Sequence, residues 1–290
     1  MTLTVLRPGP LALLQDGGRR GHAADGVGRS GAADRASHAR ANVLVGNDPG
    51  AVAIEVTLGG LVVRAERDLT VAMTGAPAPA DIDGDPAEHD TAVTMSQGQT
   101  LRLRAPKVGL RSYLAVAGGI DVPLVLGSAS TDTLSKLGPA PLVKGDELRA
   151  PSGRRIGTSS GAGELPAPTR IGEPVTTLRV VFGPRDDWFT DATALTAGQW
   201  RVSPQSNRVG VRLDRPDPDP ADFTRASNGE IPSEGMVLGA IQVPPSGQPV
   251  LFLADHPLTG GYPVIAVVLD DDIDRAAQLR PGQRLRFVSA

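Results

Sequence analysis

The chain has 290 residues and a formal net charge of −3 at pH 7, so it is long enough for one large or two ordinary domains. A charge this close to neutral argues against nucleic acid as the main partner. The absence of cysteine excludes a disulfide framework, thiolate chemistry and a cysteine-based metal site. No segment approaches the roughly 18 apolar residues of a membrane span, and the N-terminus has no signal-like apolar run. We therefore expect a cytoplasmic protein that acts neither on nucleic acid nor in a membrane.

The first elements in chain order are a glycine-rich segment and a helix. Residues 26–31, Gly-Val-Gly-Arg-Ser-Gly, formally match the dinucleotide-binding fingerprint. That motif functions only when an apolar strand leads into it, and the polar residues 19–25 are no such strand. After it, the pattern predicts a helix over residues 32–45, with Ser30 as its N-cap and residues 46–49 ending it.

From residue 51 onward, the apolar pattern changes from helical to strand-like. Short runs rich in Val, Leu and Thr are separated by glycine or charged residues, which is typical of strands joined by tight turns. The predicted strands cover residues 52–58, 61–65, 69–73, 101–104 and 111–117. Their spacing favours an all-β antiparallel barrel or sandwich, with a few short helices, over alternating strands and helices.

A five-residue pattern that recurs three times suggests two halves. It reads Gly, Gln or Asp, any residue, Leu, Arg, and it occurs at residues 98–102, 145–149 and 282–286. Two of these copies stand where a barrel's closing strand would lie, although chance matches are also common in glycine-rich chains. Between the halves, Ser, Gly, Thr and Pro crowd together. We therefore predict an N-terminal β-barrel subdomain at 1–150, a linker at 151–174 and a C-terminal β-barrel subdomain at 175–290.

The C-terminal half continues the strand pattern. It contains predicted strands at 178–182 and 209–213, a short predicted helix at 186–195, and a proline-rich exposed loop at 216–220. Two further apolar runs, 237–243 and 250–253, are joined by a turn rich in proline and glycine. Polar residues follow both runs, either as a site at strand ends or as caps of two hairpins.

Several motifs of well-known enzymes do not occur in the chain. The four histidines show no paired spacing with carboxylates, so we expect no metal site. No Gly-x-Ser-x-Gly elbow is present, which argues against a serine hydrolase of that type. No Walker loop is present either, so ATP, if used, is bound by another device or by a partner.

Two arginines and one loop in the polar segments are candidates for binding an anion. Arg111 and Arg208 can each fork onto two oxygens of a carboxylate or phosphate, or else form structural ion pairs. Ser128, Ser130 and Thr131 offer hydroxyls and consecutive backbone N–H groups, either as an anion-binding nest or as an ordinary hydroxyl-stabilised loop.

The stretch 233–263 is the densest in polar groups. The candidates for proton transfer there are Glu234, Asp255 and His256, and Tyr262 can donate a hydrogen bond to an oxyanion. Further candidates for binding a substrate or nucleotide are Gln242, Thr259, Gly260 and Gly261, because paired glycines let a ligand approach the backbone. Glu234 can equally be a buried structural acid.

A set of motifs running in order along nearly the whole chain carries a family resemblance. The motifs are Gln15-Asp16 with Gly18-Arg19, then residues 41–47, 109–119, 127–132, 182–184, 203–208 and 233–263. With them the chain closely resembles the second component of the bacterial two-component proteins long labelled allophanate hydrolase and now linked to 5-oxoprolinase, where it is the KipA-like component. The same module is one half of the carboxyltransferase domain of urea carboxylases.

The resemblance implies a fold, partners and a reaction. The fold would be two cyclophilin-like β-barrel subdomains, and the partners would be a KipI-like protein and a LamB/YcsF-like protein. Together they would use ATP with Mg²⁺, bound by this chain or by a partner, to open the small cyclic amide 5-oxoproline to glutamate. The alternatives are an allophanate hydrolase or urea carboxylase type of carboxyltransferase component, here without covalent biotin, and a regulatory, kinase-inhibitor-associated binding protein without catalysis.

Overall fold

The computed structural model describes residues 2–151, 164–215, 224–226 and 231–290. The chain divides into two compact units, each described here by itself. The N-terminal unit comprises residues 1–20, 30–132 and 136–171, and the C-terminal unit comprises residues 21–29, 133–135 and 172–290. Residues 152–163 of the predicted linker and the predicted loop at 216–220 lie outside the described residues.

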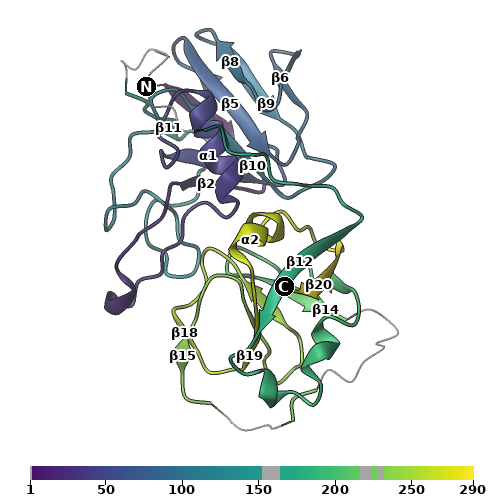
Figure 1. Ribbon diagram of the computed structural model, residues 1–290. Helices are drawn as coiled ribbons and strands as arrows, with labels where there is room; N and C mark the ends of the chain where they lie inside the picture. The colour runs from purple at the N-terminus through teal and green to yellow at the C-terminus, as the bar shows by residue number, and fades with distance from the viewer. Residues whose placement is uncertain (1, 152–163, 216–223, 227–230) are drawn as a thin grey trace. The chain divides into compact units, whose positions relative to one another are not determined.

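Two antiparallel sheets form the N-terminal unit (Figure 1). The six-stranded sheet has the order β11 (Glu147–Leu148), β1 (Leu3–Arg7), β4 (Val62–Ala65), β9 (Thr100–Leu103), β6 (Ala80–Ile82) and β7 (Asp85–Ala87). The five-stranded sheet has the order β2 (Leu11–Gln15), β3 (Ala53–Thr57), β10 (Arg111–Val116), β5 (Leu69–Gly75) and β8 (Ala92–Met95). All five strands predicted in this half are confirmed, each within a few residues of its predicted bounds.

The central strand of the five-stranded sheet is buried on both faces because each face meets a different layer. Leu114 and Val116 of β10 join the large apolar core of the unit. The alternate residues Tyr113 and Ala115 pack with alanines of helix α1 (Arg35–Leu44) and its flanking residues. Side chains of a strand alternate between faces, so one strand serves both layers. Small residues let α1 lie close to the sheet.

Helix α1 confirms the predicted helix but not its cap. The N-cap is Asp34, whose carboxylate accepts the Ser37 N–H at 3.0 Å. Ser30 lies four residues earlier with a φ of 53°, in the left-handed region. The prediction of Ser30 as the cap was wrong because residues 30–34 form a loop over the sheet before the helix begins. Asp34 is an equally favoured cap residue.

A closed barrel of seven strands forms the C-terminal unit (Figure 1). Its order is β12 (Val175–Phe182), β19 (Val264–Val268), β16 (Ala240–Gln242), β17 (Val250–Phe252), β14 (Gly210–Asp214), β13 (Trp200–Val202) and β20 (Arg284–Ser289). The last strand closes the barrel by pairing with β12 in parallel. Leu178, Ile241 and Leu285 are among the buried residues that fill its core.

Short elements accompany the barrel. They are helix α2 (Asp270–Ala276), the 3₁₀ turns η1 (Ala23–Asp25), η2 (Asp186–Trp188) and η3 (Ala192–Leu195), and the ribbon of β15 (Glu234–Gly235) with β18 (Thr259–Gly260). The helix predicted at 186–195 is thus two separate 3₁₀ turns, because the backbone of Phe189 between them is extended. The fold as a whole confirms the predicted all-β class with a few short helices.

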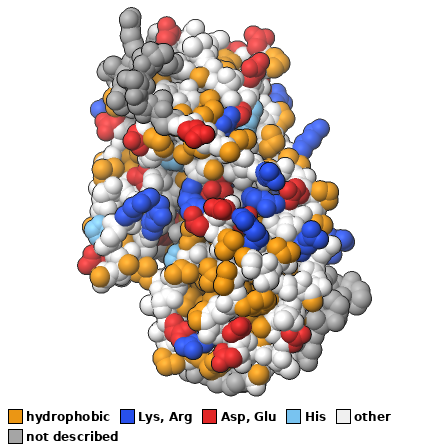
Figure 2. Space-filling model, in the orientation of Figure 1, with side chains coloured by type: hydrophobic (Ala, Val, Ile, Leu, Met, Phe, Trp, Pro, Cys, Tyr) orange, Lys and Arg blue, Asp and Glu red, His pale blue; other side chains and the backbone are white. Residues whose placement is uncertain are grey.

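Two global features bear on possible partners. Among the described residues, no helix is long and apolar enough to cross a membrane. On the face drawn in Figure 2, Lys and Arg side chains are interspersed with Asp and Glu, so neither sign of charge dominates that face.

Candidate functional site

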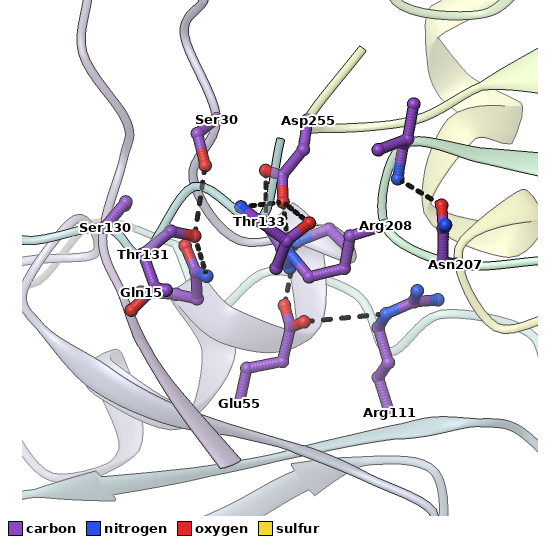
Figure 3. Close-up of polar contacts among 12 residues, drawn as sticks. Gln15, Ser30, Glu55, Arg111, Ser130, Thr131, Thr133, Asn207, Arg208 and Asp255 are labelled. Atoms are coloured by element: carbon purple, nitrogen blue, oxygen red, sulfur yellow. Dashed lines mark hydrogen bonds and ion pairs between the residues drawn. The ribbon is translucent and has the colours of Figure 1, made fainter. Parts of the chain in front are cut away.

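One face of the five-stranded sheet carries a group of buried polar side chains. In the register of β2, β3 and β10, Glu55 lies opposite both Leu13 and Tyr113. Because side chains two residues apart share a face, Gln15 and Arg111 point to the same side as Glu55. This is the face that α1 covers, and Figure 3 shows Gln15, Glu55 and Arg111. We call Gln15, Glu55, Arg111 and Tyr113 the polar face.

Glu55 and Arg111 form a buried ion pair at the centre of the polar face. Arg111 is 2% exposed and Glu55 is 1% exposed. The Arg111 Nε lies 3.5 Å from Glu55 Oε1 (Figure 3). Glu55 Oε2 accepts the Tyr113 hydroxyl at 2.8 Å and the Ala33 N–H at 3.0 Å. Two side chains of β10 and one backbone N–H before α1 therefore hold the carboxylate.

Tyr113 serves this pair as a neutral donor. Burial, with the charge of Glu55 as a further cause, raises the pKa of Tyr113 well above its usual 10.0. The phenol therefore keeps its proton and donates it in a hydrogen bond to Glu55. Its oxygen accepts a hydrogen bond from the Asp34 N–H at 2.8 Å, which connects the polar face to the N-cap residue of α1.

Gln15 and Thr131 meet at one end of the polar face (Figure 3). The Gln15 Nε2 donates to the Thr131 carbonyl at 2.9 Å. The Gln15 Oε1 and Thr131 Oγ1 are buried and have no hydrogen-bond partner among the described residues. The Gln15 carbonyl lies 3.1 Å from His38 Nε2, and burial lowers the pKa of His38, so this imidazole is neutral at pH 7. The chain thus presents an amide oxygen and a hydroxyl with free hydrogen-bonding capacity.

The other two hydroxyls of the 127–132 loop are used within the protein. Ser128 and Ser130 donate to Asp16 Oδ1 at 2.6 and 2.5 Å, and the Ala129 N–H donates to Oδ2 at 2.7 Å. Burial raises the pKa of Asp16, but these hydrogen bonds together outweigh it and hold the pKa below the usual 3.8. For Ser128 and Ser130 the geometry therefore favours a structural loop over an anion-binding nest. Thr131 differs, since its hydroxyl has no such role.

In the C-terminal unit, Arg208 and Asp255 form a buried, two-pronged ion pair. The Arg208 Nε and Nη2 donate to the two carboxylate oxygens at 2.9 and 3.0 Å (Figure 3). Asp255 Oδ2 also accepts the N–H and the hydroxyl of Thr133, at 2.9 and 2.7 Å. A carboxylate with this many donors is stabilised as an anion, which favours a structural ion pair over proton transfer. The next residue, His256, has its Nδ1 2.8 Å from the Pro257 carbonyl.

The β15–β18 ribbon carries three of the predicted residues. Glu234 lies opposite Gly260 in the register of the two strands, and the exposed Thr259 precedes Gly260 in β18. Its carboxylate is paired with Arg185. The Arg185 Nη2 donates to Glu234 Oε1, and the Arg185 Nε donates to Glu234 Oε2 at 3.3 Å. The Glu234 side chain is 25% exposed, so this acid is partly buried within its ion pair with Arg185. Tyr262 is exposed, at 44%.

Gly260 has a packing reason to be glycine. A Cβ at this position would lie 2.4 Å from Gln242 Nε2. Gln242 donates from that same nitrogen to the Tyr262 carbonyl at 3.0 Å. At Gly261, by contrast, the nearest atom to a Cβ would be the Ile231 carbonyl oxygen at 3.7 Å. Gly260 therefore makes room for Gln242, whereas Gly261 leaves space beside the backbone.

Sequence reasoning identified Arg111 and Thr131 but missed their neighbours Gln15, Glu55 and Tyr113. The signals were present in the chain. Glu55 is a charged residue inside the apolar run 52–58, and Gln15 ends an apolar strand. A charge buried in a strand requires a partner, and this requirement points to Arg111 on a neighbouring strand. Among the described residues, no group of three or more His, Asp or Glu side chains is placed to hold a metal.

Comparisons with known proteins place this geometry in context. The family model described as "Carboxyltransferase domain, subdomain A and B" matches residues 25–289. The chain is 39% identical to the C component of the 5-oxoprolinase of Escherichia coli, over 99% of this chain and 90% of that protein. It is 33% identical to urea amidolyase of Saccharomyces cerevisiae, over 99% of this chain but 16% of that protein. The solved structure of TTHA0988 gives a TM-score of 0.88 at 38% identity and covers 99% of this chain. The chain spans 55% of the length of that solved chain.

Proposed function

Because the chain belongs to the family of carboxyltransferase domains, subdomains A and B, we propose that it is one component of an ATP-dependent 5-oxoprolinase complex. In this proposal the complex opens the lactam ring of 5-oxoproline to give glutamate, with consumption of ATP and water. The observation that carries the proposal is the 39% identity to a protein named as the C component of a 5-oxoprolinase, over nearly the full length of both chains. Two further proteins, one KipI-like and one LamB/YcsF-like, complete the proposed complex.

The polar face and Thr131 are the proposed substrate-binding groups of this chain. A lactam is planar and needs an acceptor for its N–H and a donor for its carbonyl oxygen. Gln15 Oε1 and Thr131 Oγ1 have this capacity and no partner among the described residues. Arg111 adds a positive charge nearby on the same face, which suits the negative charge that develops when the lactam oxygen is activated. Glu234, His256 and Tyr262 stay proposals as proton-transfer or donor groups.

ATP and Mg²⁺ enter the proposal as co-substrates of the whole complex. A phosphoryl group transferred from ATP to the amide oxygen would make the amide carbon susceptible to attack by water, after which the ring C–N bond breaks and inorganic phosphate is released. The described residues contain no group of acidic side chains suited to Mg²⁺. We assign no step of the phosphoryl transfer to residues of this chain, and in this proposal ATP and Mg²⁺ bind either to this chain or to the partner proteins.

The test is reconstitution. The purified chain is combined with its two proposed partners, and ADP release is measured with and without 5-oxoproline. We expect release only when all three proteins and 5-oxoproline are present. ADP release that proceeds equally well without this chain, or that never depends on 5-oxoproline, contradicts the proposal.

A carboxyltransferase-type reaction on urea or allophanate is the second candidate. It is favoured by the 33% identity to urea amidolyase over 99% of this chain. The same reconstitution, supplied with carboxybiotin as the carboxyl donor when urea is the substrate, decides between the two, because urea or allophanate then replaces 5-oxoproline as the substrate that supports turnover. A third outcome, binding of partners with no turnover on any of these substrates, supports the regulatory alternative.

A further inference from the structure

Arg19 is a buried cation that forms no ion pair with any carboxylate among the described residues. The residue is 1% exposed, and its Nε donates to the Val125 carbonyl at 3.2 Å. Its Nη2 donates to the Ser130 carbonyl, and its Nη1 is buried without a hydrogen-bond partner among the described residues. No ion pair joins Arg19 to any carboxylate in the described part of the chain. Buried charges in proteins are nearly always paired, so this guanidinium lacks its expected anion.

Two further buried polar atoms without partners belong to the same pair of segments. Arg19 contacts the carbonyl of Ser130, and the adjacent Thr131 carries a hydroxyl without a partner among the described residues. Gln15, four residues before Arg19, contacts the Thr131 carbonyl and carries an amide oxygen that likewise has no partner there. Each buried polar group without a partner is unfavourable by about 1–3 kcal/mol, so three such groups on two contacting segments require an explanation.

The chemistry of the three atoms describes one kind of ligand. A guanidinium N–H suits a carboxylate, a hydroxyl suits a carbonyl oxygen, and an amide oxygen accepts an N–H. We propose that Arg19, Gln15 and Thr131 bind a small amide that also carries an anionic group. This assignment rests on the proposed function. The ligand is then 5-oxoproline, with its carboxylate bound by Arg19 and its lactam bound by Gln15 and Thr131.

The loop that connects Gln15 with Arg19 reaches the surface of the protein at Gly17, which is exposed. Gly17 and Gly18 lie between them, and a Cβ placed on Gly17 would meet no atom within 4 Å. Gly18 has a φ of 80°, in the left-handed region that favours glycine. The short glycine segment thus reverses the chain and returns Arg19 to the segment that Gln15 contacts.

The sharpest test separates stability from binding at Thr131. In Thr131→Val the unsatisfied hydroxyl is replaced by a methyl group of similar size. We expect the KM of the reconstituted complex for 5-oxoproline to rise about tenfold, with an unchanged KM for ATP. We expect the melting temperature of the chain to stay the same or to rise by about 2–4 °C. Thr131→Ser keeps the hydroxyl and is expected to retain the wild-type KM.

A matched control is available at Thr74 in β5 of the five-stranded sheet. Thr74 is also buried, but its hydroxyl donates to the Ser37 carbonyl at 2.6 Å. Thr74→Val therefore removes a satisfied hydrogen bond, and we expect it to lower the melting temperature while the KM stays unchanged. If Thr131→Val instead lowers the melting temperature in the same way, the Thr131 hydroxyl has a structural role and the assignment is overturned.

The role of Arg19 is tested by measuring how strongly the complex prefers a lactam that carries a carboxylate over one that does not. The probes are 5-oxoproline and 2-pyrrolidone, which has the same lactam ring without the carboxylate. The wild-type complex should bind 5-oxoproline more tightly, and Arg19→Gln should reduce that preference by about tenfold or more. An unchanged preference in Arg19→Gln overturns the proposal.

Failure of the proposed function gives a different pattern of results. If the wild-type complex neither binds nor turns over 5-oxoproline, titration with allophanate, a urea with a carboxylate on one nitrogen, tests the site on its own. Binding of allophanate that weakens in Arg19→Gln keeps the site and refutes only the oxoprolinase assignment. Absence of binding for both compounds overturns the site.

Discussion

Replacing Arg111 by methionine should separate the structural from the chemical role of the buried ion pair. Arg111 is 2% exposed, and its Nε is 3.5 Å from Glu55 Oε1. Methionine fills a similar volume without charge, so the substitution leaves the Glu55 carboxylate buried with donors but without this cation. Simple truncation to alanine, by contrast, would add a cavity and make loss of activity difficult to interpret.

The expected magnitude follows from the burial of both groups. Removing one partner of a buried ion pair destabilises a protein by about 3–5 kcal/mol. The 3.5 Å separation of this pair is longer than a good hydrogen bond, so we expect the lower end, about 3 kcal/mol. For a unit of about 150 residues this lowers the melting temperature by about 6–12 °C. In the double variant Arg111→Met, Glu55→Gln the charge disappears, while the introduced amide oxygen can still accept from Tyr113, so most of this loss should be recovered.

Calorimetry is the suitable stability assay, because both tryptophans, Trp188 and Trp200, lie in the C-terminal unit and their fluorescence would not report directly on this sheet. The reconstituted turnover assay is then applied to the folded double variant. If Arg111 acts on substrate, the double variant stays inactive although its stability is restored. Wild-type turnover in the double variant would show that the pair only supports the fold, and a stable single variant would refute the reasoning on buried charge.

Two further substitutions test other contacts. Ser128→Ala removes a donor from Asp16, whose pKa is raised by burial but lowered below 3.8 overall by its hydrogen bonds. We expect the free energy of unfolding to fall by about 1.5–3 kcal/mol above pH 4. This difference should disappear as the pH falls through the depressed folded-state pKa of Asp16, because the stabilisation exists only while the carboxylate is ionised. Urea unfolding measures it, and an equal loss at neutral and low pH would contradict this. Gly260→Ala should cost about 1–3 kcal/mol because its Cβ would lie 2.4 Å from Gln242 Nε2. In a Gln242→Ala background the same glycine substitution should cost much less, and thermal unfolding of both single variants and the double variant checks whether this contact is the cause.

The sequence was sufficient to predict the strands whose apolar pattern is distinct, because that signal is local. The run 111–117, for example, appears in the structure as Arg111–Val116. Alternation and turn residues determine such a strand without knowledge of its neighbours. The helix at 186–195 failed for the opposite reason. Its residues have no strong local preference, and the chain there forms the two short 3₁₀ turns Asp186–Trp188 and Ala192–Leu195.

The roles of individual site residues depend on contacts between distant segments, which sequence alone does not reveal. Ser128 and Ser130 were candidates because hydroxyls and backbone N–H groups cluster there, and only the structure shows Asp16 accepting from both. Glu55 was overlooked because it resembled one polar residue in an ordinary strand. Its importance follows from the register that sets it opposite Tyr113, with Arg111 on the same face.

The same two segments that carry the free hydrogen-bonding groups are also joined by the firmest contacts of the 127–132 loop. Asp16 accepts from Ser128 and Ser130, and Gln15 donates to the carbonyl of Thr131. These bonds use the carboxylate of Asp16 and the nitrogen of Gln15, so that the Gln15 oxygen and the Thr131 hydroxyl are held in place without being consumed by the described residues. A site that must recognise a planar amide needs some polar atoms to hold the loop and others to remain available for the ligand. Groups fixed by their neighbours bind a ligand with little loss of conformational entropy. In the proposed site, the hydrogen bonds within the chain therefore orient the groups that are left available for substrate.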